Sequence, residues 1–192
     1  MGLNEIVWQR AQRLLAPFQV VVFDLDGTLV ALEVDWGEVL DEMINFGVAE
    51  LRRDFTTRDV WQMLRDTEGS DREGLERILR RREIAGALRA RTLPLADLLP
   101  LLGERQLGVV SLNSRASCET ALESAGLTRY VDAIVAREDS KRLKPDPEPL
   151  LQCIKALGSV PQASVFIGDR ERDRITARRA GTHFVGAQEL HP

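Results

Sequence analysis

Short apolar segments alternate with amphipathic stretches along most of the chain. Residues 20–23 form a continuous run of valines and a phenylalanine, a pattern typical of a strand that is covered on both faces. From residue 93 onward the periodicity predicts, in order, helix 95–105, strand 107–111, helix 115–125, strand 131–135, helix 148–157, strand 163–167, helix 171–180 and strand 183–186. This alternation favours an α/β fold with a doubly wound parallel sheet and right-handed crossovers.

Residues 34–92 follow a different pattern. Helical periodicity predicts helices over 36–53, 57–65 and 71–91, with no convincing strand between them. We therefore predict a core formed by residues 1–33 and 93–192, interrupted by a helical insertion at 34–92. Four aromatic residues are expected in the apolar centre of this insertion rather than as a stacking platform for a ligand: Trp36, Phe46, Phe55 and Trp61.

Composition and charge argue against several function classes. With 192 residues, 44% of them apolar and 29% charged, the chain has the make-up of a soluble globular protein. Its net charge of −4 gives no electrostatic reason to expect nucleic-acid binding. Residues 3–16 have the pattern of an amphipathic helix, not of a signal peptide or a membrane span, so we expect a cytoplasmic protein. The two cysteines and two histidines show no metal-binding spacing.

Polar side chains follow the predicted strands at the points where each strand ends. Asp24 and Asp26 follow the first strand, and their spacing of two places both on one side of an extended chain. The later strand ends carry Ser111, Asn113, Lys144, Asp169 and Asp173. Because the carboxyl ends of parallel strands meet at one edge of a sheet, we expect these side chains to converge. So many carboxylates repel one another unless a cation is bound, and short oxygen ligands favour Mg²⁺.

Taken together, these motifs resemble the haloacid dehalogenase superfamily. The segments "DLDGT", the hydroxyl of Ser111, the lysine of "KPDPEP" and "GDRERD" occur in its order and spacing, and the helical insertion resembles the cap of its phosphoglycolate phosphatase-like branch. The resemblance implies that Asp24 is a nucleophile that forms an aspartyl-phosphate. Asp26 would protonate the leaving oxygen and then activate water, and Lys144 would neutralise Asp24 and the phosphate.

The same resemblance implies where substrate and metal bind. Ser111 and the neighbouring backbone N–H groups, at Leu112 and Asn113, would hold the phosphoryl oxygens. Mg²⁺ would be bound by Asp24, the main-chain carbonyl of Asp26, and Asp169, with Asp173 either a direct ligand or a support from the same helix turn. The sequence therefore predicts a Mg²⁺-dependent phosphatase that acts on a small phosphorylated metabolite.

Two other functions stay open at this point. A sugar-phosphate mutase of the same superfamily has a use for Asp26, and a regulatory protein could retain this fold without activity. Dehalogenase chemistry has no use for an acid at position 26, and a phosphonatase needs a lysine in the insertion, where residues 30–92 contain none. The segment "LVALEVDW" departs from phosphoglycolate phosphatases, which often continue with an Asp-Ser pair, so the substrate stays open.

Overall fold

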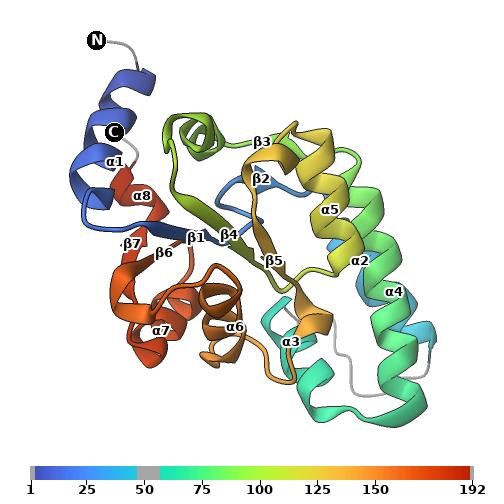
Figure 1. The fold of residues 1–192 in the computed structure, drawn as a ribbon. Helices are drawn as coiled ribbons and strands as arrows, with labels where there is room; N and C mark the ends of the chain where they lie inside the picture. Colours follow the sequence, from blue (N-terminus) through green and yellow to red (C-terminus); the bar gives the residue numbers. More distant parts are fainter. Residues whose placement is uncertain (1–2, 47–56, 191–192) are drawn as a thin grey trace.

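The computed structural model describes residues 3–46 and 57–190. Its centre is a five-stranded parallel sheet with the order β5-β4-β1-β6-β7 (Figure 1). The strands are β1 (Val20–Phe23), β4 (Gln106–Val110), β5 (Ala133–Val135), β6 (Ser164–Gly168) and β7 (His183–Gly186). β1 pairs with β4 on one side and with β6 on the other, so the chain crosses the sheet in both directions from its centre. The α/β fold with a doubly wound parallel sheet is thus confirmed.

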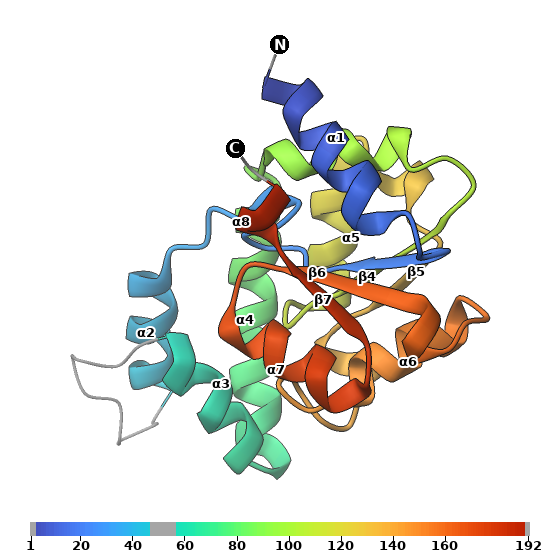
Figure 2. The same cartoon turned by 90° about the vertical axis from the view of Figure 1, so that its left-hand side faces the viewer.

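β1 is apolar at every position because both faces of the sheet are covered. Val21 and Phe23 point into one core cluster, together with side chains of helices α1 (Leu3–Leu15) and α5 (Arg115–Ser124). Val20 and Val22 point into a second cluster on the opposite face, with side chains of α6 (Glu148–Ala156) and α7 (Glu171–Ala180). Figure 2 shows these two helical layers on either side of the sheet.

The predicted element bounds agree with the structure to within two residues in most of the core. The segment predicted as helix 95–105 is an exception, because it forms the shorter 3-10 helix η1 (Pro94–Leu101). Pro100 lies inside this segment and has no backbone N–H, so an α-helical hydrogen-bond ladder does not continue through it. Short 3-10 helices also form at η2 (Thr128–Tyr130), η3 (Arg137–Asp139) and η4 (Pro161–Ala163), and α8 (Ala187–Leu190) is the last helix of the described residues.

The insertion consists of helices α2 (Trp36–Asn45), α3 (Thr57–Asp66) and α4 (Gly69–Ala87) in the part that the structure describes. The helix predicted at 71–91 begins two residues earlier and ends four residues earlier, because Arg91–Thr92 forms strand β3, which pairs antiparallel with β2 (Val30–Ala31). The expectation of no strand in this insertion is therefore wrong at its last two residues. The helix predicted at 36–53 ends at Asn45, with Phe46 as its C-cap, and residues 47–53 lie outside the described residues.

The insertion packs directly on loops of the core. Apolar side chains of α2, α3 and α4 form one cluster with Leu112 and Leu143, which lie in the loops after β4 and before α6. In Figures 1 and 2 these three helices lie beyond the end of the sheet at which β1 ends. Among the helices of the described residues, none combines the length and the apolar character that a membrane crossing requires.

Gly108 allows α6 to pack closely against β4, and its replacement is the first testable change. A Cβ atom at Gly108 would lie 2.5 Å from Cys153 Sγ and 3.0 Å from Leu157 Cδ1. We therefore expect Gly108→Ala to lower the free energy of unfolding by about 1–3 kcal/mol, measured by urea denaturation. In a Cys153→Ala background the same change should cost clearly less, because the closest atom is gone. Equal cost in both backgrounds would contradict this packing.

Candidate active site

The ends of three adjacent strands meet beside a cavity of about 180 Å³. Asp24 directly follows β1, the Ser111 loop follows β4, and Asp169 follows β6. Because β4, β1 and β6 are neighbours in a parallel sheet, their carboxyl ends lie at one edge. Of the residues predicted for the site, Asp24, Asp26, Leu112, Asn113 and Lys144 line this cavity. The predicted convergence of polar strand ends is found in the structure.

The turn after β1 places its two carboxylates differently. The backbone N–H of Asp24 donates to Ile167 O (2.8 Å), so this residue extends the pairing of β1 with β6. The carboxylate of Asp26 accepts the backbone N–H of Leu32 at 2.9 Å. Gly27 follows Asp26 in this turn and has a φ of +86°. A Cβ atom at Gly27 would lie 2.6 Å from Asp169 Oδ2. Glycine at this position therefore lets the turn and the Asp169 carboxylate approach each other.

Lys144 is buried and uses all three of its ammonium hydrogens. Its Nζ atom lies 2.7 Å from Asp24 Oδ1, 2.7 Å from Asp173 Oδ1 and 3.2 Å from the carbonyl oxygen of Val110. An ammonium group has three donors, so these contacts satisfy it completely. One cation thus connects the end of β1, the end of β4 and the first turn of α7.

Burial raises the pKa of three carboxylates at these strand ends, those of Asp24, Asp26 and Asp169. The pKa of Asp24 rises to about 7 because burial outweighs the opposing effect of Lys144. Burial also raises the pKa of Asp26, against the hydrogen bond from Leu32, and the pKa of Asp169, against the charge of Arg170. For Lys144, burial alone would lower the pKa, yet the carboxylates beside it raise it, so the ammonium stays charged. The site therefore has more buried negative charge than its lysine balances.

Carboxylate oxygens of Asp24, Asp169 and Asp173 lie within 4.8 Å of one another. Asp173 has both oxygens engaged, one with Lys144 and one with the backbone N–H of Arg170 at 3.1 Å. Asp169 Oδ1 is buried and has no hydrogen-bond partner among the described residues. Oxygen donors on Asp24 and Asp169 therefore fit a hard divalent cation such as Mg²⁺, and Asp173 fits the role of holding Lys144. The carboxylate of Asp26 lies outside this group.

The loop after β4 is held by its own hydrogen bonds. The backbone N–H of Ser111 donates to Val135 O (3.0 Å), which extends the pairing of β4 with β5. The hydroxyl of Ser111 donates to Asn113 Oδ1 (2.9 Å) and accepts the backbone N–H of Asn113 (3.1 Å). Both residues are buried, so the loop has a defined conformation at the floor of the cavity.

Among the described residues, four more line the cavity, and none of them was assigned to the site from the sequence. Trp36 and Trp61 come from the insertion, and their rings meet edge to face with centroids 6.1 Å apart. Both belong to the apolar cluster of the insertion, as expected, but they also form a wall of the cavity. The same expectation is wrong for Phe46, which is exposed, and Phe55 lies outside the described residues. Arg170 and Arg172 lie inside the "GDRERD" motif and add positive charge at the rim. That motif could have drawn attention to Arg170 and Arg172, whereas no local pattern marks the two tryptophans, because only the fold brings the insertion to the cavity.

Solved structures with a similar fold were found over almost the whole chain. A Bacteroides fragilis protein provisionally described as a haloacid dehalogenase-like hydrolase aligns with a TM-score of 0.70 and 24% identity, covering 91% of this chain and 94% of its own. A Lactobacillus plantarum protein provisionally described as a phosphoglycolate phosphatase aligns with a TM-score of 0.69 and 24% identity, covering 90% of this chain and 87% of its own. At this identity the similarity shows the fold alone.

Sequence comparison identifies the family. Pyrophosphatase PpaX of Bacillus velezensis is 33% identical over 81 residues, which are 42% of this chain and 38% of that protein. The matched part of this relative is therefore well under half of its length. The sequence pattern of the haloacid dehalogenase-like hydrolase family matches residues 21–187, from β1 to the start of α8. This chain therefore belongs to the haloacid dehalogenase-like hydrolases.

Proposed function

We propose that this protein is a Mg²⁺-dependent phosphatase that hydrolyses a small phosphomonoester through an aspartyl-phosphate on Asp24. The observation that carries the proposal is the buried Asp24 carboxylate, held 2.7 Å from Lys144 at the floor of a cavity that Asp26 also lines. Membership of the haloacid dehalogenase-like hydrolases, together with the partial match to a relative named pyrophosphatase, supports hydrolysis of phosphate compounds as the class of reaction. The cytoplasm is the compartment that we infer for it.

Asp24 and Asp26 divide the chemistry between them. An oxygen of the Asp24 carboxylate attacks phosphorus, an Asp24–phosphorus bond forms, and the bond from phosphorus to the leaving oxygen breaks. Asp26 donates a proton to that leaving oxygen, and burial favours its protonated form because it raises the pKa of this carboxyl. Water then attacks phosphorus, Asp26 accepts a proton from it, and phosphate leaves as Asp24 regains its carboxylate.

The remaining residues bind and orient the phosphoryl group. Lys144 offsets the negative charge of Asp24 and of the phosphate, which would otherwise repel each other. Leu112 and Asn113 line the cavity and Ser111 adjoins them, so we assign the hydroxyl of Ser111 and the backbone of Leu112 and Asn113 to the binding of phosphoryl oxygens. Mg²⁺ held by Asp24 and Asp169, with the main-chain carbonyl of Asp26, would supply charge neutralisation of the phosphoryl oxygens.

The insertion limits the size of the substrate. Trp36 and Trp61 close one side of a cavity of about 180 Å³, which leaves room for a small leaving group beside the phosphate. Arg170 and Arg172 at the rim favour a substrate of net negative charge. We therefore assign residues 34–92 as a cap over the core formed by 1–33 and 93–192, and a small phosphorylated metabolite as the partner.

Replacement of the nucleophile is the direct mutational test. Asp24→Asn removes the attacking carboxylate at nearly constant volume, so kcat with p-nitrophenyl phosphate should fall by about 10⁴-fold or more. The variant should stay folded, because it loses a charge that burial disfavours. Asp41→Asn, which changes an exposed carboxylate of α2, is the control. Activity of Asp24→Asn within tenfold of the wild type would refute the assignment.

Metal removal tests the proposed cofactor. Treatment with a chelator should abolish turnover, and added Mg²⁺ should restore it. Asp169→Asn should weaken Mg²⁺ binding by at least about tenfold in isothermal titration calorimetry, because it removes a charged oxygen ligand. Glu171→Gln, which changes an exposed carboxylate two residues further along, should leave Mg²⁺ binding unchanged. Full turnover after exhaustive metal removal would contradict the proposal.

Two lysines of one loop allow a matched test of the buried cation. Lys144→Met leaves Asp24 and Asp173 without their shared partner, so we expect a loss of activity and a loss of about 3–5 kcal/mol in the free energy of unfolding. Lys141→Met changes an exposed side chain three residues earlier and should alter neither quantity. If Lys141→Met is inactive and Lys144→Met is active, the wrong lysine has been assigned.

A further inference from the structure

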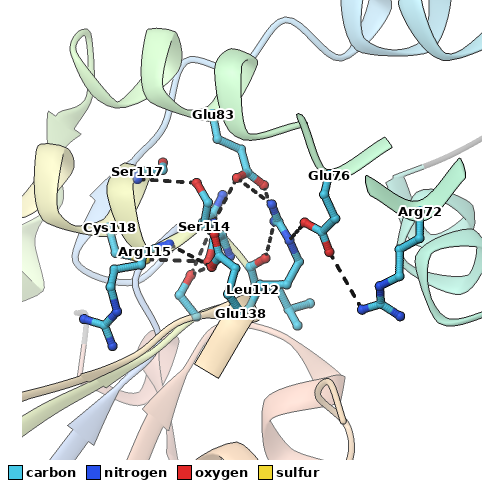
Figure 3. Close-up of polar contacts among 12 residues, drawn as sticks. Arg72, Glu76, Glu83, Leu112, Ser114, Arg115, Ser117, Cys118 and Glu138 are labelled. Atoms are coloured by element: carbon cyan, nitrogen blue, oxygen red, sulfur yellow. Dashed lines mark hydrogen bonds and ion pairs between the residues drawn. The ribbon is translucent and has the colours of Figure 1, made fainter. Parts of the chain in front are cut away.

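A buried ion pair connects the insertion to η3, and both of its members contact the loop after β4. The side chains of Arg137, in η3, and Glu83, in α4, are both 0% exposed. Arg137 Nη1 lies 2.6 Å from Glu83 Oε1 and Nη2 lies 3.1 Å from Oε2, so the contact is bidentate. Its Nε atom donates to Glu76 Oε2 at 2.7 Å. Figure 3 shows Glu76 and Glu83 pointing from their helix toward Leu112 and Ser114.

The guanidinium orients the peptide bond between Leu112 and Asn113. Arg137 Nη1 also donates to the carbonyl oxygen of Leu112 at 2.7 Å. The N–H of the same peptide group, on Asn113, donates to Ser111 Oγ at 3.1 Å. Since C=O and N–H point in opposite directions in a trans peptide, this group is held at both ends. Arg137 thus determines where the N–H that contacts the Ser111 hydroxyl points.

The next peptide bond is held by the same two residues. The carbonyl oxygen of Asn113 accepts the backbone N–H of Arg137 at 3.0 Å. The N–H of Ser114 donates to Glu83 Oε2 at 2.9 Å. Two successive peptide groups are therefore fixed between a residue of η3 and a residue of the inserted helix α4. The same guanidinium lies 5.6 Å from the ring centroid of Trp61, which forms a wall of the cavity.

We propose that Arg137 and Glu83 are positioning residues for the phosphate-binding loop at Ser111–Ser114. The inserted helix α4 then supplies part of the scaffold of the active site itself, in addition to covering the cavity. This inference rests on the proposed function, because it assumes that the loop binds the phosphoryl group. When such a loop is displaced by even a fraction of the length of a hydrogen bond, turnover falls strongly although the chain stays folded.

Stability alone is a weak explanation for this pair. Two buried charges are costly to desolvate, and an apolar pair of similar volume often gives equal stability. An ion pair that only attaches α4 to the core would need no contact with the Leu112 carbonyl or the Ser114 N–H. Instead, both members of the pair form hydrogen bonds with the backbone of one loop. That double use favours a role in loop geometry.

Two variants distinguish a role of the ion pair in positioning the loop at Ser111–Ser114 from a role in attaching α4 to the core. Arg137→Met combined with Glu83→Gln removes both buried charges together, leaves a side-chain oxygen for the Ser114 N–H, and removes the donor to the Leu112 carbonyl. Arg137→Lys keeps the charge but loses the planar fork that contacts Glu83 and Leu112 at once. We expect both proteins to unfold within a few degrees of the wild type in thermal melts. We expect kcat/KM with p-nitrophenyl phosphate to fall about 100-fold in the double variant and about tenfold in Arg137→Lys.

Binding of inorganic phosphate gives a readout that does not depend on turnover. In isothermal titration calorimetry with Mg²⁺ present, both variants should bind phosphate at least about tenfold more weakly than the wild type. Arg82→Met is the matched control, because Arg82 neighbours Glu83 on α4 but forms its ion pairs with Glu38 and Glu42 of α2. We expect this control to keep kcat/KM and phosphate affinity within about threefold of the wild type.

The outcomes for the two proposals are distinguishable. A wild-type protein that releases no phosphate from p-nitrophenyl phosphate or from a panel of small phosphomonoesters would overturn the proposed function. Folded Arg137 variants with wild-type phosphate affinity would overturn the positioning role, whether or not turnover is seen. An equal loss in Arg82→Met would also overturn it, because the effect would then belong to attachment of α4 in general.

Discussion

The ammonium group of Lys144, buried between the carboxylates of Asp24 and Asp173, is the interaction on which the site depends. Each of its partners comes from a different part of the fold: the end of β1, the end of β4 and the first turn of α7. A charge so deeply buried is tolerated only where opposite charges satisfy it, so these segments must meet at this point. The parallel sheet meets this requirement because its strand ends converge at one edge.

The charge at this edge also explains the proposed chemistry. Burial raises the pKa values of Asp24, Asp26 and Asp169 together, which signals a site that is completed by positive charge. Lys144 offsets part of that charge and a divalent cation would offset more. The insertion adds the tryptophan wall and, through Glu83, the support of the loop after β4. Core and insertion are thus coupled at the residues that would contact a phosphoryl group.

The order of apolar and polar residues predicted those helices and strands whose formation depends on residues close to one another in the sequence. β1, α7 and β7 have the predicted bounds, because an apolar run, helical periodicity and the left-handed Gly181 at the end of α7 are visible in the sequence. The segment 95–105 was predicted as an α-helix, and its internal Pro100 explains the 3-10 conformation instead. Arg91–Thr92 was missed as a strand because its pairing partner lies across the whole insertion.

The residues of the candidate site that belong to short sequence motifs could be predicted from the sequence. Asp24, Asp26 and Asp169 stand at strand ends, where polar residues after apolar runs are conspicuous, and Lys144 stands in the "KPDPEP" motif before α6. The pair of Arg137 and Glu83 has no such signal, because its members are 54 residues apart and each stands in a charge-rich segment that reads as solvent-exposed. Their burial depends on how α4 packs against the core, and only the assembled fold shows it.

The central claim, that Asp24 carries the phosphoryl group during turnover, is tested most directly by rapid acid quench. The wild-type protein with Mg²⁺ and p-nitrophenyl phosphate would be quenched within the first turnover, digested and examined by mass spectrometry. We expect the mass of a phosphoryl group on the peptide that contains Asp24, with lability in alkali as an acyl phosphate requires. A burst of p-nitrophenol with no phosphoryl group on the protein, or with that group on another residue, would contradict the account.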